Sequence, residues 1–100
     1  MFEQISINDI LYVAKEKRGI IIDLRSEDEY EKGHIKGAIN VPMEEIQEKG
    51  FPFSTKRTFL LYCKYGTRSM RVAKLLYEQG YHVINTVGGM YQYTGDLYRK

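Results

Sequence analysis

The sequence predicts an α/β domain of three layers, in which a mainly parallel central sheet carries helices on both faces. Short apolar runs of strand length, such as residues 20–22 and 59–62, alternate along the chain with segments of helical periodicity. That alternation is typical of parallel sheets, because each strand is joined to the next by a helix. The length of 100 residues predicts one domain over 1–100, and a hydrophobic fraction of 43% is enough for its core.

The first half of the chain opens with a short edge strand at 2–5. Ser6 is then expected to cap a helix that ends near Gly19, and the inner face of this helix carries Ile7, Ile10, Leu11 and Ala14 at helical spacing. Residues 19–24 are rich in isoleucine and predict a buried strand. Ser26 and Glu29 form a capping box for a short helix, which Gly33 ends.

The second half continues the same alternation and ends in a less regular tail. A loop at 51–54 carries two aromatic residues that we expect to be exposed, and the late helix buries Val72, Ala73 and Leu76. Gly88 and Gly89 open a last helical stretch, which Gly95 interrupts. The predicted elements are strands at 38–41, 58–62 and 81–85, a short helix around 43–46, and a longer helix at 68–79.

Polar and flexible residues follow three of the predicted strands. Asp23 and Arg25 end one strand, Cys63 ends another, and Gly88 follows a third. Ligands of open α/β sheets bind beyond the carboxyl ends of the strands. These residues are therefore expected to share one rim, with Cys63 as the marker of a site.

Cys63 is the only cysteine, and it lies between a buried strand and the start of a helix. Unpaired N–H groups at a helix start favour a thiolate over a thiol. Four residues separate Cys63 from Arg68, and Gly66 between them lets the loop curl its N–H groups inward as an anion-binding nest. Thr67 and Ser69 add hydroxyl groups, although helix capping alone would explain them. A lone cysteine is more often a buried structural thiol, but the glycine and arginine favour an active site here.

Composition and patterning argue against several classes of protein. A net charge of +2 is too small to predict nucleic-acid binding, and no apolar run approaches the roughly 20 residues of a membrane span. No signal peptide is expected, and a single cysteine fits a reducing compartment, so we expect a cytoplasmic protein. No metal-ligand spacing is present, and neither a metal nor another cofactor is expected. His34 lies in a turn and is expected to be structural. The basic residues Lys64, Arg68, Arg71 and Lys74 suit an anionic substrate or an acidic partner, although Arg71 and Lys74 fit a solvated helix face.

The motifs, taken in order, resemble those of the single-domain rhodaneses. Four segments carry the resemblance, namely 23–25 (Asp-Leu-Arg), 29–42 around Gly33-His34-Ile35, the cysteine loop 63–69, and 88–90 (Gly-Gly-Met). The resemblance implies a sulfurtransferase with a sheet of about five parallel strands. The related dual-specificity phosphatases have one more residue between cysteine and arginine, so the shorter loop fits a sulfur atom. Tyr93 stands where the family often has tryptophan, and the tail 94–100 fits the family pattern poorly.

By this resemblance Cys63 is the nucleophile and forms a persulfide with sulfur from a small anionic donor such as thiosulfate. A thiol or a protein then accepts the sulfur, as cyanide does in an assay. The substrate-binding residues implied are Arg68, Lys64, Tyr65, Gly66, Thr67 and Ser69, and the site-supporting residues are Asp23, Arg25 and Gly88. Two alternatives remain open: a sensing or protein-binding module without turnover, and a phosphatase or arsenate reductase. No motif specifies the physiological donor, the acceptor or the oligomeric state.

Overall fold

A computed structural model describes residues 1–99 and contains one five-stranded sheet. The strand order is β1-β5-β4-β2-β3, and every neighbouring pair is parallel. The predicted α/β class and the predicted parallel sheet are both confirmed. The strands are β1 (Glu3–Ser6), β2 (Ile20–Asp23), β3 (Ile39–Asn40), β4 (Thr58–Tyr62) and β5 (His82–Val87).

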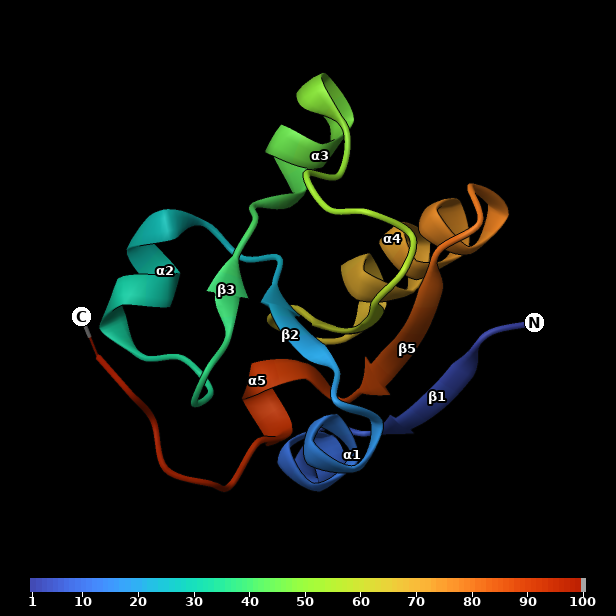
Figure 1. Ribbon diagram of the computed structural model, residues 1–100. Coiled ribbons are helices and arrows are strands. Elements are labelled where there is room, and N and C mark those ends of the chain that lie inside the picture. The colour runs from blue at the N-terminus through green and yellow to red at the C-terminus, as the bar shows by residue number, and fades with distance from the viewer. Residues whose placement is uncertain (100) are drawn as a thin grey trace.

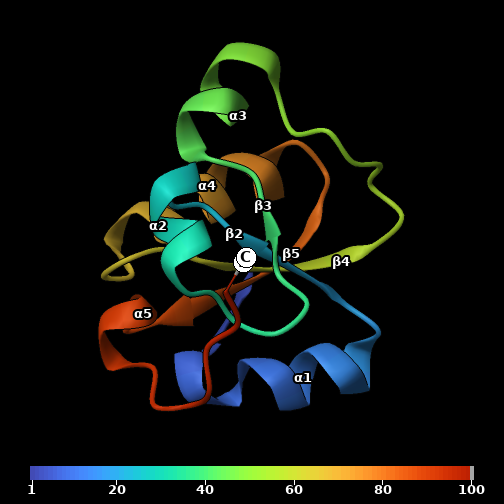
Figure 2. The same ribbon diagram turned by 90° about the vertical axis from the view of Figure 1, so that its left-hand side faces the viewer.

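Helices cover both faces of this sheet and complete three layers. Helices α3 and α4 lie on one face, and α1 and α5 lie on the other, with the sheet between them in Figure 2. The short α2 lies beside β3 (Figure 1). The helices are the 3-10 turn η1 (Ile7–Asp9), α1 (Ile10–Lys17), α2 (Glu27–Lys32), α3 (Met43–Lys49), α4 (Thr67–Glu78) and α5 (Gly89–Gln92).

The alternation of side chains along β4 divides the core into two clusters. Phe59, Leu61 and Cys63 face the α3 and α4 side, where Leu76 packs against them. The intervening side chains face α1 instead, and Tyr62 is among them. Successive side chains of a strand point to opposite faces. The strand therefore sends Cys63 toward the start of α4 and sends Tyr62 to the other face of the sheet.

Local sequence patterns account for most element boundaries, with one correction in the first helix. The Ser26 and Glu29 capping box is present at the start of α2. Ser6 caps a 3-10 turn, however, because its hydroxyl accepts the N–H of Asn8 at 3.2 Å, and the α-helix begins only at Ile10. A 3-10 turn has fewer residues per turn and shifts the helix face. Leu11 is consequently 41% exposed, so its predicted place on the inner face was wrong.

The aromatic loop at 51–54 is a second correction. Phe51 and Phe53 are half-buried rather than exposed, because the loop folds back over the start of β4. The Phe51 ring lies 4.9 Å from the Phe59 ring and 5.2 Å from the Tyr81 ring, centroid to centroid. The Tyr81 hydroxyl donates to the Phe53 carbonyl at 2.8 Å. These two phenylalanines close the α3 side of the core.

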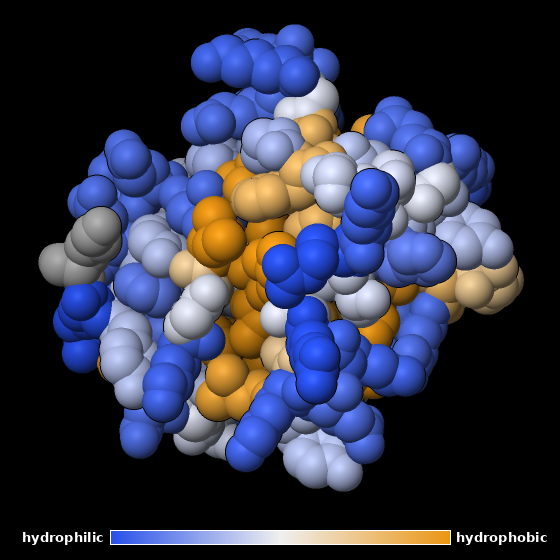
Figure 3. Space-filling model, viewed as in Figure 1, coloured by the Kyte–Doolittle hydropathy of each residue, from blue (hydrophilic) through white to orange (hydrophobic). Residues whose placement is uncertain are grey.

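The surface of the face seen in Figure 1 is mixed. Hydrophobic side chains gather in a band over β2 and β3, and hydrophilic side chains surround the band (Figure 3). Among the helices formed by residues 1–99, none has both the length and the apolar character that crossing a bilayer requires.

Candidate active site

The carboxyl ends of β2, β4 and β5 lie at one edge of the sheet, and a cavity opens there. The loop that follows β4 lies at the left of Figure 2, between α2 above and α5 below. The cavity has a volume of about 310 Å³, which is within the usual range for small-molecule sites. Arg25, which follows β2, and Cys63, which follows β4, both line it.

The sulfur of Cys63 is held by the backbone at the start of α4. Cys63 is 3% exposed, and its Sγ accepts the N–H of Gly66 at 3.0 Å and the N–H of Ser69 at 3.3 Å. Gly66 has φ of +97°, in the left-handed region that favours glycine. The Ser69 hydroxyl donates to the Gly66 carbonyl at 3.1 Å and closes the turn. Two backbone N–H groups therefore hold the sulfur at the start of α4, in a nest of the kind that binds anions.

The glycine pair Gly88 and Gly89 supports this loop from behind. The N–H of Met90 donates to the Cys63 carbonyl at 2.9 Å, and the N–H of Tyr91 donates to the Lys64 carbonyl at 3.0 Å. A Cβ on Gly89 would lie 2.5 Å from the Lys64 carbonyl oxygen. The start of α5 can approach the loop this closely because it has no side chain at that point. Gly88 lies outside the cavity around Cys63.

Charged side chains around the cavity are mostly cationic. Arg25, Lys64 and Arg68 line it together with one carboxylate, Glu29. The Lys64 ammonium lies 3.6 Å from a Glu29 oxygen, and the salt bridges within residues 1–99 do not include Arg68. Burial opposes the ionisation of Glu29, but hydrogen bonds from Ser26 and the charges of Lys64 and Arg25 outweigh it, so the pKa of Glu29 is lowered. The cavity therefore favours an anionic ligand.

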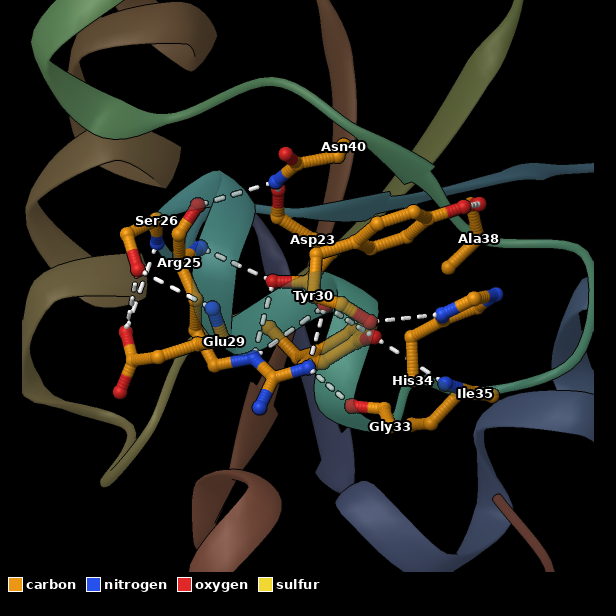
Figure 4. A network of polar contacts seen from close by, with 11 residues as sticks. Asp23, Arg25, Ser26, Glu29, Tyr30, Gly33, His34, Ile35, Ala38 and Asn40 are labelled. Carbon is orange, nitrogen blue, oxygen red and sulfur yellow. Dashed lines mark hydrogen bonds and ion pairs between the residues drawn. The ribbon is translucent and has the colours of Figure 1, made fainter. Parts of the chain in front are cut away.

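The opposite wall is a buried network centred on Asp23 (Figure 4). Arg25 donates through Nε to Oδ1 of Asp23 at 3.0 Å and through Nη2 to Oδ2 at 2.7 Å. The same Nη2 donates to the Gly33 carbonyl at 2.6 Å. The Tyr62 hydroxyl donates to Asp23 at 2.6 Å and accepts the Ile35 N–H at 3.2 Å. Asp23 is fully buried, and this geometry holds Arg25 in a single orientation at the cavity.

The pKa values of this network follow from burial and from the Asp23 charge. Burial raises the pKa of the Tyr62 phenol far above its ordinary value, and the nearby Asp23 carboxylate adds to the rise. Burial acts to lower the pKa of Arg25, but the hydrogen bond and charge of Asp23 outweigh it and raise that pKa. Both shifts favour a neutral Tyr62 phenol and a charged Arg25 guanidinium.

The remaining residues of the predicted site have different environments. Tyr65 and Thr67 line the cavity, and the Tyr65 ring is 60% exposed beside the ring of Tyr91. Tyr93 packs against the α1 side of the core and does not line the cavity. In the tail, Tyr98 forms a two-way backbone bridge with the turn at residue 34. The last tail residue, Lys100, lies outside the described residues.

His34 occupies a structural position beside α2. Its ring stacks on Tyr30 with centroids 3.8 Å apart, and its Nδ1 lies 2.8 Å from the Tyr30 carbonyl. The cavity around Cys63 does not include it. The geometry therefore offers His34 no contact with a ligand bound there.

Two cavity residues, Leu24 and Glu29, were absent from the predicted site. The capping box is a sufficient local reason for a glutamate at position 29, so the motif by itself gives no indication that Glu29 also lines a cavity. A capping carboxylate lies at the start of its helix, and α2 starts directly after β2 at the cavity edge. The position of this capping box directly after the end of a strand is the sequence signal that indicates Glu29 as a cavity residue.

Comparison with known proteins identifies the family of this chain. The family model of the rhodanese-like domain matches residues 8–96. The thiosulfate sulfurtransferase GlpE of Coxiella burnetii is 34% identical over 90 residues, which cover 89% of this chain and 84% of the relative. The putative sulfurtransferase YtwF of Bacillus subtilis is 35% identical over 80 residues, with 80% and 78% covered. A crystal structure of a rhodanese-like domain protein from Staphylococcus aureus matches with a TM-score of 0.83 at 29% identity, over 99% of both chains. The chain belongs to the rhodanese-like family.

Proposed function

We propose that the protein is a sulfurtransferase that carries sulfur as a persulfide on Cys63. The observation that carries the proposal is the position of the Cys63 sulfur, which accepts two backbone N–H groups beneath a cavity lined by three cations. The names of the relatives also refer to sulfur transfer. We include in the proposal that residues 1–100 act as one domain in a reducing compartment such as the cytoplasm.

The first half-reaction loads the cysteine. The Cys63 thiolate attacks the outer sulfur of thiosulfate, a bond forms between the two sulfurs, and the sulfur–sulfur bond of thiosulfate breaks. Sulfite leaves with the electron pair of that bond, and Cys63 becomes a persulfide. Arg68 and Lys64 balance the charge of the donor, because both line the cavity and are exposed.

The second half-reaction returns the cysteine to its starting state. A thiolate of the acceptor attacks the terminal sulfur of the persulfide, and the new bond forms as the bond to Cys63 breaks. The electron pair returns to Cys63 as a thiolate, which the N–H groups of Gly66 and Ser69 stabilise. Cyanide can replace the thiolate, with thiocyanate as the product. The cycle needs no added oxidant or reductant.

Two other activities use a cysteine in a similar loop and stay as alternatives to be tested. A phosphatase or arsenate reductase must surround a tetrahedral oxyanion, and by resemblance its loop has one more residue between cysteine and arginine than this chain has. Hydrolysis of an aryl phosphate would support that alternative. A sensing module would accept sulfur once and release it slowly, so multiple turnover distinguishes the transferase from it.

The direct test is intact-mass measurement after incubation with thiosulfate. The wild-type protein should gain the mass of one sulfur atom and lose it again on addition of cyanide, with thiocyanate formed in equal amount. The Cys63→Ser variant should gain nothing, because its hydroxyl forms no persulfide. A wild-type protein that gains no sulfur from thiosulfate or from any other sulfane donor would show that the proposal is wrong.

A further inference from the structure

A second cavity lies on the other side of the cysteine loop from the cavity described above. It is a groove of about 430 Å³ between β1, β5 and the start of α4. Tyr65 and Thr67 line both cavities, so the loop forms the wall between them. Five further side chains line the groove, namely Gln4, Met70, Arg71, Asn85 and Val87.

Asn85 has a buried oxygen without a partner at this groove. The residue is 1% exposed, and its Nδ2 donates to Gln4 at 3.3 Å and contacts the Met70 sulfur at 3.9 Å. Within residues 1–99, its Oδ1 has no hydrogen-bond partner. Asn85 itself lines the groove together with Gln4 and Met70, whose side chains both contact its Nδ2, so the amide lies beneath these two side chains at the groove floor. A buried acceptor left unpaired is unfavourable, and a ligand that supplies an N–H there removes that cost.

Apart from Gln4 and Thr67, the other side chains of the groove wall are apolar or aromatic, except for one that carries a charge. Val87 is 53% exposed, Met70 is 38% exposed, and the Tyr65 ring is also open to solvent. Met70 has a flexible side chain that can move off the amide. Among the described residues that line the groove, Arg71 is the one with a charge, and it is exposed. An occupant should therefore offer an N–H donor, an aliphatic group and a carboxylate.

We propose that this groove binds an acidic, extended segment of a protein that accepts sulfur from Cys63. The inference rests on the proposed function and adds the class of acceptor to it. A polypeptide supplies a backbone N–H beside an aliphatic side chain, which matches Asn85 beside Val87. An aspartate or glutamate of the same segment pairs with Arg71. An extended chain advances about 3.3 Å per residue, so a cysteine a few residues away passes Tyr65 and reaches the persulfide.

The probes are two synthetic peptides that each contain a single cysteine. One alternates aspartate with valine before a Gly-Cys end, and the other has lysine in place of aspartate. The protein is first loaded with sulfur from thiosulfate, and the transfer of that sulfur to each peptide is followed by mass at concentrations below saturation. We expect the acidic peptide to take sulfur about tenfold faster than the basic one, because its aspartates are attracted to Arg71 whereas the lysines of the other peptide are repelled by it.

Variants at the groove should slow transfer to the acidic peptide alone. Arg71→Glu and Val87→Asp should each lower that rate about tenfold, while loading by thiosulfate and discharge to cyanide stay unchanged. The matched controls are Lys74→Glu and Leu75→Asp, which alter exposed residues of α4 that do not line the groove. Asn85→Leu should slow peptide transfer while thiosulfate loading shows that the variant is folded.

Three results would overturn the inference. They are equal rates for the acidic and basic peptides, equal losses in the groove variants and their controls, and an unchanged peptide rate in a loaded Asn85→Leu protein. Failure of the proposed sulfurtransferase function would give a different result from failure of the groove proposal, because the wild-type protein would then not load sulfur from thiosulfate at all. Groove variants that also slow discharge to cyanide would assign the groove residues to the persulfide site instead.

Discussion

The two walls of the Cys63 cavity are built from different parts of the chain. The cysteine loop holds its sulfur with backbone N–H groups, and its cations Lys64 and Arg68 are exposed. The wall at the end of β2 holds Arg25 with the buried carboxylate of Asp23. One wall therefore depends on the path of the backbone, and the other depends on the identity of its side chains.

Because of this difference, the residues of the loop should matter for ligand binding and reaction, whereas the residues of the β2 wall should matter for the stability of the fold. Exposed charges contribute little to folding, so the cations of the loop are free to serve a ligand. A buried ion pair is costly to disrupt, because the partner that remains keeps an uncompensated charge. Changes in the β2 wall should consequently lower the free energy of unfolding strongly, and changes in the loop should impair sulfur loading with little loss of stability.

The largest expected effect comes from Asp23→Ala. The variant leaves Arg25 charged in a site where its side chain is 9% exposed and deprives the Tyr62 hydroxyl of its acceptor. Breaking a buried pair in this way costs about 3–5 kcal/mol, and urea unfolding would measure the loss. Arg68→Ala should change the free energy of unfolding by less than about 0.5 kcal/mol. Equal losses in the two variants would remove the distinction between the walls.

The next effect tests the backbone of the loop with Gly66→Ala. Gly66 has φ of +97°, and an added Cβ would lie 3.0 Å from the Gly88 nitrogen, so the loop must shift. Since removing one such N–H donor slows an enzyme by about 10²–10³-fold, a displaced donor should slow sulfur loading by about 10–100-fold. Gly37→Ala is the matched control, because Gly37 has φ of +80° and open space around its Cβ position. Both variants should lose about 1–2 kcal/mol of stability from backbone strain, and Gly37→Ala should load sulfur at the normal rate.

The same contrast explains what could be predicted from the sequence. Periodicity and caps have local causes, so the strands, the Ser26 and Glu29 capping box and the inner face of α4 were predicted correctly. Contacts between segments that are distant in sequence carry no such pattern. The packing of Gly89 against the Lys64 carbonyl, the burial of Phe51 and the presence of Glu29 in the cavity depend on how the elements meet.

A smaller effect is expected for Arg68→Ala during loading. Removing this cation should raise the KM for thiosulfate about five- to tenfold, which corresponds to about 1–1.4 kcal/mol, and should change kcat less. The matched control is Arg71→Ala, because Arg71 lies on the same helix and is exposed but does not line the Cys63 cavity. A neutral sulfane donor should show little change in either variant. Equal losses for charged and neutral donors would show that Arg68 acts on the loop rather than on the donor.

The smallest effect concerns Glu29, which lies where the two walls meet. Its pKa is lowered from the ordinary 4.5, because hydrogen bonds from Ser26 and the charges of Lys64 and Arg25 outweigh the effect of burial. A lowered folded-state pKa means that the ionised carboxylate stabilises the protein above about pH 5 and that this contribution disappears as the pH falls through the folded-state value.

Glu29→Gln keeps a capping oxygen but not the charge. We therefore expect urea unfolding to show a stability difference of less than about 1 kcal/mol between wild type and Glu29→Gln at pH 6 that closes near pH 3. A difference that stays constant across this range would assign the stabilisation to the capping hydrogen bonds alone, and the link between α2 and the cysteine loop would then contribute nothing to folding.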